Sequence, residues 1–306
     1  MSLNIQNLKP WMMPVAMIVG AVFHNHIAMF QPVVPYFIFT MLLIAFCKVE
    51  PREFRVTRLS WWLLSVQLGG ATLVYLALIG AGADLAQAAF ICVLCPTATA
   101  APVVTGMLGG NVARLATYSI VSNIAAAISA PAFFALIGTH AEMSFMEGVL
   151  AIAAKVAPLI LLPLLLAFGM SFWLPGVHRR IAGYQSVSFY LWSVSLIVAV
   201  GGSVSYVMGA DPERVPEIIA IALIALLMCL VQFIAGRKIG RACGDKIAGA
   251  QGLGQKNTIL AIWMALTYLN PISSVGPAAY IVWQNTINSI QLYMAARNKQ
   301  SAAKGR

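Results

Sequence analysis

Charged residues are scarce in this chain: only 9% of its 306 residues are Asp, Glu, Lys or Arg, whereas 60% are hydrophobic. A soluble domain of this length needs far more charge to cover its surface. Apolar runs recur along the whole length, and many reach the roughly 20 residues that cross about 30 Å of hydrocarbon. The composition therefore predicts an all-α, multi-pass membrane protein that has the lipid bilayer as a partner.

Carboxylates are missing from the interior of every apolar stretch. Carriers coupled to protons or sodium commonly use a buried Asp or Glu to titrate or to hold the ion, so this absence argues against the usual coupling group. An enzyme embedded in the membrane needs a nucleophile with a base, or a metal cluster, and the stretches offer neither. We therefore expect that the protein is not an enzyme.

Cysteine and histidine are also few. The five cysteines are odd in number and fall in apolar stretches or their flanks, so no disulfide framework is predicted. Cys92 and Cys95 have the spacing of a redox motif, but the sequence places no His or basic residue near them, which favours two small packed residues. The four histidines fall in predicted loops without ligand spacing. We expect no metal and no cofactor.

Hydropathy and helix-breaking residues together predict ten membrane spans. They lie near residues 11–28, 32–47, 59–81, 85–107, 112–137, 145–172, 184–208, 215–235, 246–268 and 274–296. With a cytoplasmic N-terminus, sixteen Lys and Arg fall inside and Arg214 alone falls outside, which is the positive-inside pattern. Both termini are then cytoplasmic. This pattern accounts for the net charge of +10, and no basic stripe or RNA motif predicts a nucleic-acid partner.

The order of the spans predicts an internal repeat within a single domain, 1–306. Five spans in 11–137 precede a negative external loop, and five more follow in 145–296. An odd number of spans in each half makes the two repeats inverted, as in many secondary transporters.

The fourth span of each half is interrupted at a corresponding place. Pro96 and Pro102 interrupt the first, and three glycines open the second in GAQGLGQKNTILA (249–261). An unwound helix exposes backbone groups that lipid cannot satisfy, so it must lie in protein or against a wet cavity. The restarting half-helices present N–H groups that suit a carboxylate. The polar residues expected to contact a substrate there are Thr97, Thr99, Asn257 and Thr258, with Gln255 beside them.

Lys256 is a lone cation between apolar segments of the ninth span. An ammonium at bilayer depth is costly unless it faces protein or water, so an intramembrane Lys indicates a substrate or ion pathway. We include Lys256 among the expected substrate contacts.

Three segments together carry a resemblance to a known family: CPTATAAPVVTGMLGGNVARLATYSIVSNIAAAISAPAF (95–133), GQKNTILAIW (254–263) and PAAYIVWQNTINSI (277–290). They resemble the bile acid:sodium symporter family in its bacterial branch, within the bile/arsenite/riboflavin transporter superfamily. Shorter similarities at 35–54 and 153–165 extend the resemblance over essentially the whole chain.

The resemblance implies ten spans in two inverted five-helix repeats, arranged as a panel and a core subdomain, with discontinuous fourth and ninth helices that cross. It also implies alternating access, a bacterial inner (plasma) membrane location and small organic anions as substrates, such as bile acids, sulfate conjugates or pantoate. Asn285 lies in the W-x-N segment that lines the family's substrate cavity. We expect a monomer.

The departures from the family concern sodium. Where sodium-using members carry a Ser-Asn pair, this chain has Ala101 and Pro102, and a fifth-helix Ser is replaced by Leu115. Ser119 alone keeps a hydroxyl at that first site. The second site keeps Gln67 and Gln255, but its Glu is replaced by Gln251. Sodium as a coupling ion is therefore doubtful.

Lys256 stands where the family usually has Asn, so its ammonium could fill the space of a sodium ion. Three interpretations remain open: a tethered charge that makes transport sodium-independent, a lysine that couples protons, and a structural cation held by carbonyls. We predict a sodium-independent or proton-coupled transporter of a small organic anion. The alternatives are a sodium-coupled symporter that uses Gln67, Gln251 and Gln255, and a passive facilitator or channel.

The predicted topology is testable with reporter fusions at the C-terminus. Because the positive-inside pattern places this end in the cytoplasm, a green fluorescent protein fusion should fluoresce in bacterial cells and an alkaline phosphatase fusion should be inactive. Labelling of a C-terminal cysteine by a membrane-impermeant reagent in intact cells would contradict the topology.

Overall fold

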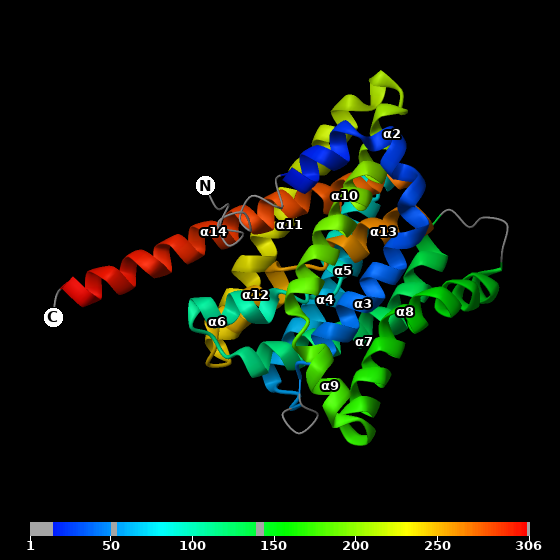
Figure 1. Ribbon diagram of the computed structural model, residues 1–306. Coiled ribbons are helices and arrows are strands. Elements are labelled where there is room, and N and C mark those ends of the chain that lie inside the picture. The colour runs from blue at the N-terminus through cyan, green and yellow to red at the C-terminus, as the bar shows by residue number, and fades with distance from the viewer. Residues whose placement is uncertain (1–14, 50–53, 139–143, 305–306) are drawn as a thin grey trace, which may run out of the picture.

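A computed structural model describes residues 15–49, 54–138 and 144–304. Nearly all of these residues are helical, and none of them forms a named β-strand (Figure 1). The start of the first predicted span and most of the predicted external loop lie outside the described residues, as do Lys9, Arg52 and His140. The all-α class predicted from composition is confirmed.

Six helical segments of the described residues are long and apolar enough to cross a bilayer, which supports a multi-pass membrane protein. They are His24–Phe46, Arg58–Leu78, Val112–Ile137, Phe145–Trp173, Tyr190–Met208 and Pro212–Ala242. Many of their large apolar side chains face outward; Leu73, Leu165 and Leu223 are more than half exposed. Such a surface is costly in water but suits lipid tails.

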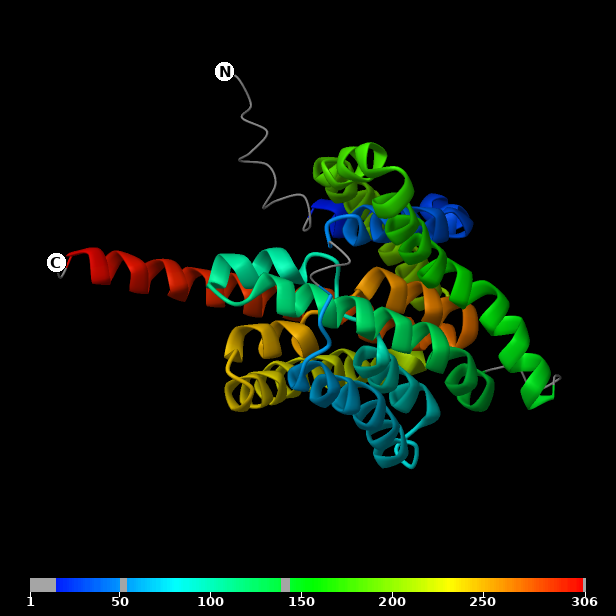
Figure 2. The same cartoon turned by 90° about the horizontal axis from the view of Figure 1, so that it is seen from below.

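A first helical segment at 15–22 is followed along the chain by long helices, shorter helices and 3-10 turns. They are α2 (His24–Ile27), η1 (Ala28–Val33), α3 (Val34–Phe46), α4 (Arg58–Leu78), α5 (Ala83–Leu94), α6 (Ala101–Leu108), α7 (Val112–Ile137), α8 (Phe145–Trp173), α9 (Pro175–Ala182), α10 (Gln185–Met208), η3 (Pro212–Arg214), α11 (Val215–Ala242), α12 (Lys246–Gly254), α13 (Thr258–Tyr268), η4 (Pro271–Ser274) and α14 (Val275–Lys304). The C-terminal part of α14 projects beyond the other helices (Figure 2).

Two local predictions differ from the structure. The histidines were expected in loops, but His24 and His26 lie in α2 and His178 lies in α9. The short helix α9 was not predicted; it starts at Pro175, and proline is well suited to the first turn of a helix because its missing N–H has no partner there in any case.

The predicted fourth and ninth spans are each divided into two helices. The first ends at Leu94 because Pro96 follows, and its continuation α6 starts with Pro102 in its first turn. The second ends at Gly254, and its continuation α13 starts where the side chain of Asn257 accepts a hydrogen bond from the backbone N–H of Leu260. Both breaks coincide with the interruptions read from the sequence.

Helices α11 and α12 pack closely because three glycines meet between them. A Cβ atom added at Gly249 would lie 2.2 Å from the carbonyl oxygen of Gly236 and 2.6 Å from the Cα atom of Gly240. Small residues at such an interface let two backbones approach, which is a common packing device in membranes. This packing holds α12, and with it the second break, against α11.

We predict that Gly249→Ala destabilises the protein by about 1–3 kcal/mol, because the added methyl group overpacks this backbone contact. Gly69→Ala is the matched control, since a Cβ atom at exposed Gly69 in α4 meets nothing within 4 Å. It should leave stability unchanged or raise it slightly. Thermal unfolding in detergent measures both variants. Equal melting temperatures for the two variants would contradict the proposed packing.

Candidate functional site

The two helix breaks cross and pair with each other. Thr97 and Lys256 form an antiparallel bridge. On either side of it, the N–H of Ala98 donates to the carbonyl of Gln255 at 2.9 Å, and the N–H of Asn257 donates to the carbonyl of Pro96 at 2.8 Å. The two unwound segments therefore satisfy part of each other's backbone hydrogen bonding, which the lipid could not do.

The C-terminal end of α5 is completed by side chains from elsewhere in the chain. A helix leaves its last four carbonyls without partners inside the helix. Here the carbonyls of Ile91, Cys92, Val93 and Leu94 accept from Cys95 N at 3.1 Å, Gln232 Nε2 at 3.2 Å, Lys256 Nζ at 2.8 Å and Gln67 Nε2 at 2.7 Å, respectively. All four are satisfied, three of them by long-range side-chain contacts.

The carbonyls at the C-terminal end of α12 are also capped, two of them by side chains from other elements. The hydroxyl of Thr97 donates to the carbonyl of Gly252 at 2.7 Å, and the hydroxyl of Tyr280 donates to that of Gly254 at 2.9 Å. The N–H of Gln255 donates to the carbonyl of Gln251 at 3.1 Å. Each break thus supplies a side chain that caps the half-helix of the other break.

These contacts are reciprocal along the sequence. Lys256 caps Val93, which precedes Thr97 by four residues, and Thr97 caps Gly252, which precedes Lys256 by four residues. The backbone N–H groups of both residues also find side-chain acceptors. That of Thr97 donates to Ser122 Oγ at 3.1 Å, and that of Lys256 donates to Gln284 Oε1 at 2.8 Å.

Lys256 is 1% exposed, and its ammonium lies at the carbonyl end of α5. A helix carries roughly half a negative charge at this end, so a cation is stabilised there without a carboxylate. The ammonium bonds to Val93, which lies between Cys92 and Cys95 in the chain, and Cys95 Sγ donates to the carbonyl of Asn257, the residue after Lys256, at 2.9 Å. The expectation that no basic residue is near these cysteines was therefore wrong, because the tertiary crossing brings Lys256 to them.

A cavity of about 310 Å³ lies beside the crossing. Its polar lining includes five of the six predicted substrate residues, namely Thr99, Lys256, Asn257, Thr258 and Asn285. Apolar residues of α3, α6 and α10 form much of the remaining wall, including Ile38, Met41, Leu42, Val103 and Trp192. No Asp or Glu is among the lining residues that the structure describes.

Three placements differ from the sequence-based picture of this cavity. Thr97 is fully buried and is not among the lining residues, since its hydroxyl is engaged by Gly252. Gln284 and Lys48, which the sequence did not single out, both line it. A polar residue on an apolar helix next to the expected Asn285 could have drawn attention to Gln284; Lys48 follows α3 and gives no such signal.

The residues of the expected vestigial cation sites are spread over several contacts. Gln67 Oε1 already accepts from Tyr118 at 3.0 Å and from Ser122 at 2.7 Å. Gln251 turns to α14, where its Nε2 donates to Asn288 Oδ1 at 3.0 Å and Gln291 Oε1 at 3.1 Å. The Oε1 atoms of Gln251 and Gln255 are buried without a hydrogen-bond partner among the described residues.

Apolar packing surrounds two positions at which the family resemblance implies sodium ligands. Ala101 and Leu115 are both almost fully buried in one cluster with Leu63, Tyr118 and Leu253. Ser119 is 6% exposed, and its carbonyl accepts from Asn123 Nδ2 at 2.8 Å. A cation would meet hydrocarbon rather than oxygen along the Ala101 and Leu115 side of this space.

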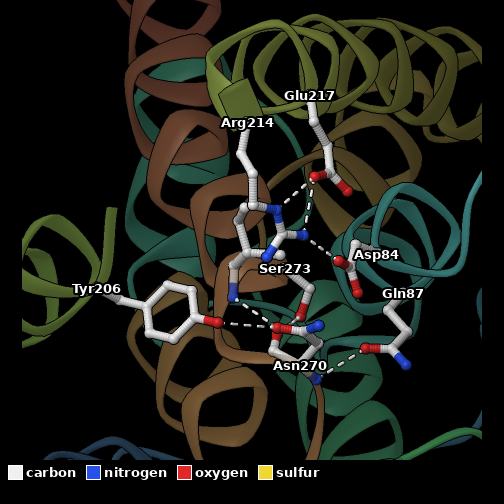
Figure 3. A network of polar contacts seen from close by, with 8 residues as sticks. Asp84, Gln87, Tyr206, Arg214, Glu217, Asn270 and Ser273 are labelled. Carbon is white, nitrogen blue, oxygen red and sulfur yellow. Dashed lines mark hydrogen bonds and ion pairs between the residues drawn. The ribbon is translucent and has the colours of Figure 1, made fainter. Parts of the chain in front are cut away.

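A second polar network lies at the other end of α5 (Figure 3). Arg214 forms ion pairs with Asp84 at the start of α5 and with Glu217 in α11. Close by, the Tyr206 hydroxyl donates to Asn270 Oδ1 at 3.3 Å, and the N–H of Asn270 donates to Gln87 Oε1 at 2.8 Å. The network ties α5, α10 and α11 to the turn after α13. Arg214 is the single basic residue that the topology prediction places outside.

In comparisons with known proteins, no protein-family model matches the chain, and no curated protein matches it with significance. The family resemblance and the roles that it implies thus remain predictions, and the geometry of the crossing must support any function on its own.

We predict that Gln67→Leu destabilises the protein by at least about 1–3 kcal/mol. The change leaves the buried carbonyl of Leu94 without its donor and the hydroxyls of Tyr118 and Ser122 without their acceptor. Ser65→Ala on the same helix is the control, because Ser65 is exposed and its hydroxyl bonds only within α4. Unfolding in detergent compares the two variants. A Gln67→Leu protein as stable as Ser65→Ala would show that this network does not hold the break.

Proposed function

We propose that the protein is a secondary transporter that carries a small organic anion across the membrane by alternating access, without sodium. The observation that carries this proposal is the crossing of two broken helices beside a cavity lined by neutral polar groups and lysines, with no carboxylate among its described residues. Helices broken within a membrane protein need a polar cavity or protein contacts, and they commonly form transporter sites.

The architecture that we propose has ten crossings in two inverted repeats. The six long apolar helices would supply six of these crossings. The divided pairs α5/α6 and α12/α13, helix α14 and the segment that starts at 15–22 would supply the other four. The reciprocal capping of Val93 by Lys256 and of Gly252 by Thr97 supports equivalent repeats. In both cases a side chain from one break donates a hydrogen bond to a carbonyl at the end of the half-helix before the other break. Panel and core subdomains, cytoplasmic termini and a bacterial inner membrane belong to the same proposal.

The cavity supports a small substrate. Its volume of about 310 Å³ is at the lower end of the ~300–1,000 Å³ typical of small-molecule pockets. Its lining combines aliphatic side chains with Thr99, Asn257 and Thr258 beside the starts of α6 and α13, and with Asn285 of α14. The positive ends of two helices and the absence of acids favour an anion over a cation. An amphipathic carboxylate of modest length fits these properties.

Sodium independence is supported by what occupies the expected ion sites. Ala101 and Leu115 pack in an apolar cluster, and both lone-pair directions of Gln67 Oε1 are used by hydroxyl donors. Lys256 places its side-chain nitrogen at the carbonyl end of α5. Of the three interpretations of Lys256, this bond to a backbone carbonyl fits a structural cation as well as a tethered charge, and both are compatible with transport that does not need sodium.

A second candidate, coupling to sodium, is favoured by one observation. The buried Oε1 atoms of Gln251 and Gln255 lack partners among the described residues, and a buried acceptor without a donor is costly. A cation or a water molecule would satisfy them. Two neutral oxygens are far fewer than the five or six that a hard cation needs, so we rank this candidate second.

We predict that uptake into proteoliposomes proceeds equally in sodium and in potassium, because the chain offers too few oxygen ligands for a sodium site. Candidate substrates come first from a thermal-shift screen of small organic anions in detergent. Preloading with unlabelled substrate should accelerate uptake of labelled substrate, as a carrier requires. A steep sodium dependence would establish the second candidate, and non-saturable flux without counterflow would establish a channel.

A further inference from the structure

Lys48 is a charged side chain in the cavity wall with no partner among the described residues. It follows the C-terminal end of α3, is exposed, and lines the same cavity as Asn257 and Asn285. Lys256 differs, because its ammonium is bonded to Val93, a residue that does not line the cavity. The described lining also contains no Asp or Glu that could neutralise Lys48. Glu50 and Glu53 lie outside the described residues.

We propose that Lys48 is the specificity-determining side chain that binds the acidic group of the substrate, while the neutral polar groups at the crossing bind its other end. This inference rests on the proposed function. A charge-assisted hydrogen bond is about twice as strong as a neutral one, so the single unpaired ammonium should dominate the choice between charged and neutral ligands. The cavity wall also lowers the pKa of Lys48 through desolvation, and a bound anion offsets that cost.

The lining between these two ends defines the body of the substrate. Ile38, Met41 and Leu42 of α3 face the cavity together with Val103 and Val104 of α6. The substrate class is therefore a short aliphatic carboxylate with an uncharged polar group at its far end. Such a molecule touches α3 at one end and the crossed helices at the other, so its binding joins elements that are far apart in the sequence.

The test uses the full chain in lipid nanodiscs and straight-chain carboxylates of three to eight carbons, with hexanamide as the uncharged counterpart of hexanoate. Calorimetry should show that the wild type prefers the carboxylate about tenfold or more over the amide. Lys48→Gln should lose this preference while amide binding stays the same. Lys48→Arg should keep most of it, because it retains the charge. Lys238→Gln is the matched control, since exposed Lys238 of α11 lies outside the cavity lining.

A second pair of ligands tests which residue binds the uncharged polar end of the substrate. The wild type should bind 6-hydroxyhexanoate more tightly than hexanoate, and Asn285→Leu should remove that gain while the preference for carboxylate over amide persists. The two ends would then be recognised by different residues.

The outcomes separate the inference from the function on which it rests. If the wild type binds and transports carboxylates and Lys48→Gln keeps the full preference, the role of Lys48 is wrong and the transporter proposal stands. If Lys256→Gln loses the preference instead, the acidic group binds at the crossing. If the wild type binds no member of the carboxylate series, both the substrate class and the role of Lys48 are overturned.

Discussion

The need to satisfy every backbone polar group at two helix breaks governs this structure. A break in an apolar helix exposes carbonyls and N–H groups that neither lipid nor hydrocarbon side chains can bond. The chain resolves this by crossing the breaks, so that Ala98 and Asn257 pair with the opposite strand-like segment. The carbonyls of Cys92, Leu94 and Gly254 are reached by side chains of α11, α4 and α14, respectively, which links these helices to the crossing.

Lys256 satisfies one of the backbone carbonyls that the helix breaks expose. An intramembrane lysine suggests a binding site, but the ammonium of Lys256 already donates a hydrogen bond to a carbonyl at the C-terminal end of α5. The same bond satisfies a backbone acceptor that the helix itself leaves without a partner. The cavity beside the crossing is then left with Lys48 as its unpaired cation among the described residues. In our proposal, Lys256 serves the crossing and Lys48 faces the ligand.

Helix α14 is more polar than the other long helices because several of its side chains form hydrogen bonds with the crossing region. Its membrane portion is too polar to count among the six long apolar helices, since it carries Gln284, Asn288 and Gln291. These side chains face inward: Gln284 accepts from the N–H of Lys256, and the other two accept from Gln251. A helix with such contacts needs less apolar surface, because its polar groups meet partners in the protein rather than lipid.

The sequence by itself determined the all-α membrane class and the positions of both breaks, because proline, glycine and apolar length act locally. Polar residues beside the breaks then pointed to four of the residues that line the cavity, and the family resemblance pointed to Asn285. It did not determine which polar groups face one another. Thr97 was expected in the cavity but caps Gly252, whereas Lys48 was not expected there and lines it. Thr97 and Gly252 lie more than one hundred positions apart in the sequence, and so do Lys48 and Asn285, which line the same cavity. Only the tertiary packing, through the direction in which each helix presents its side chains, could decide these placements.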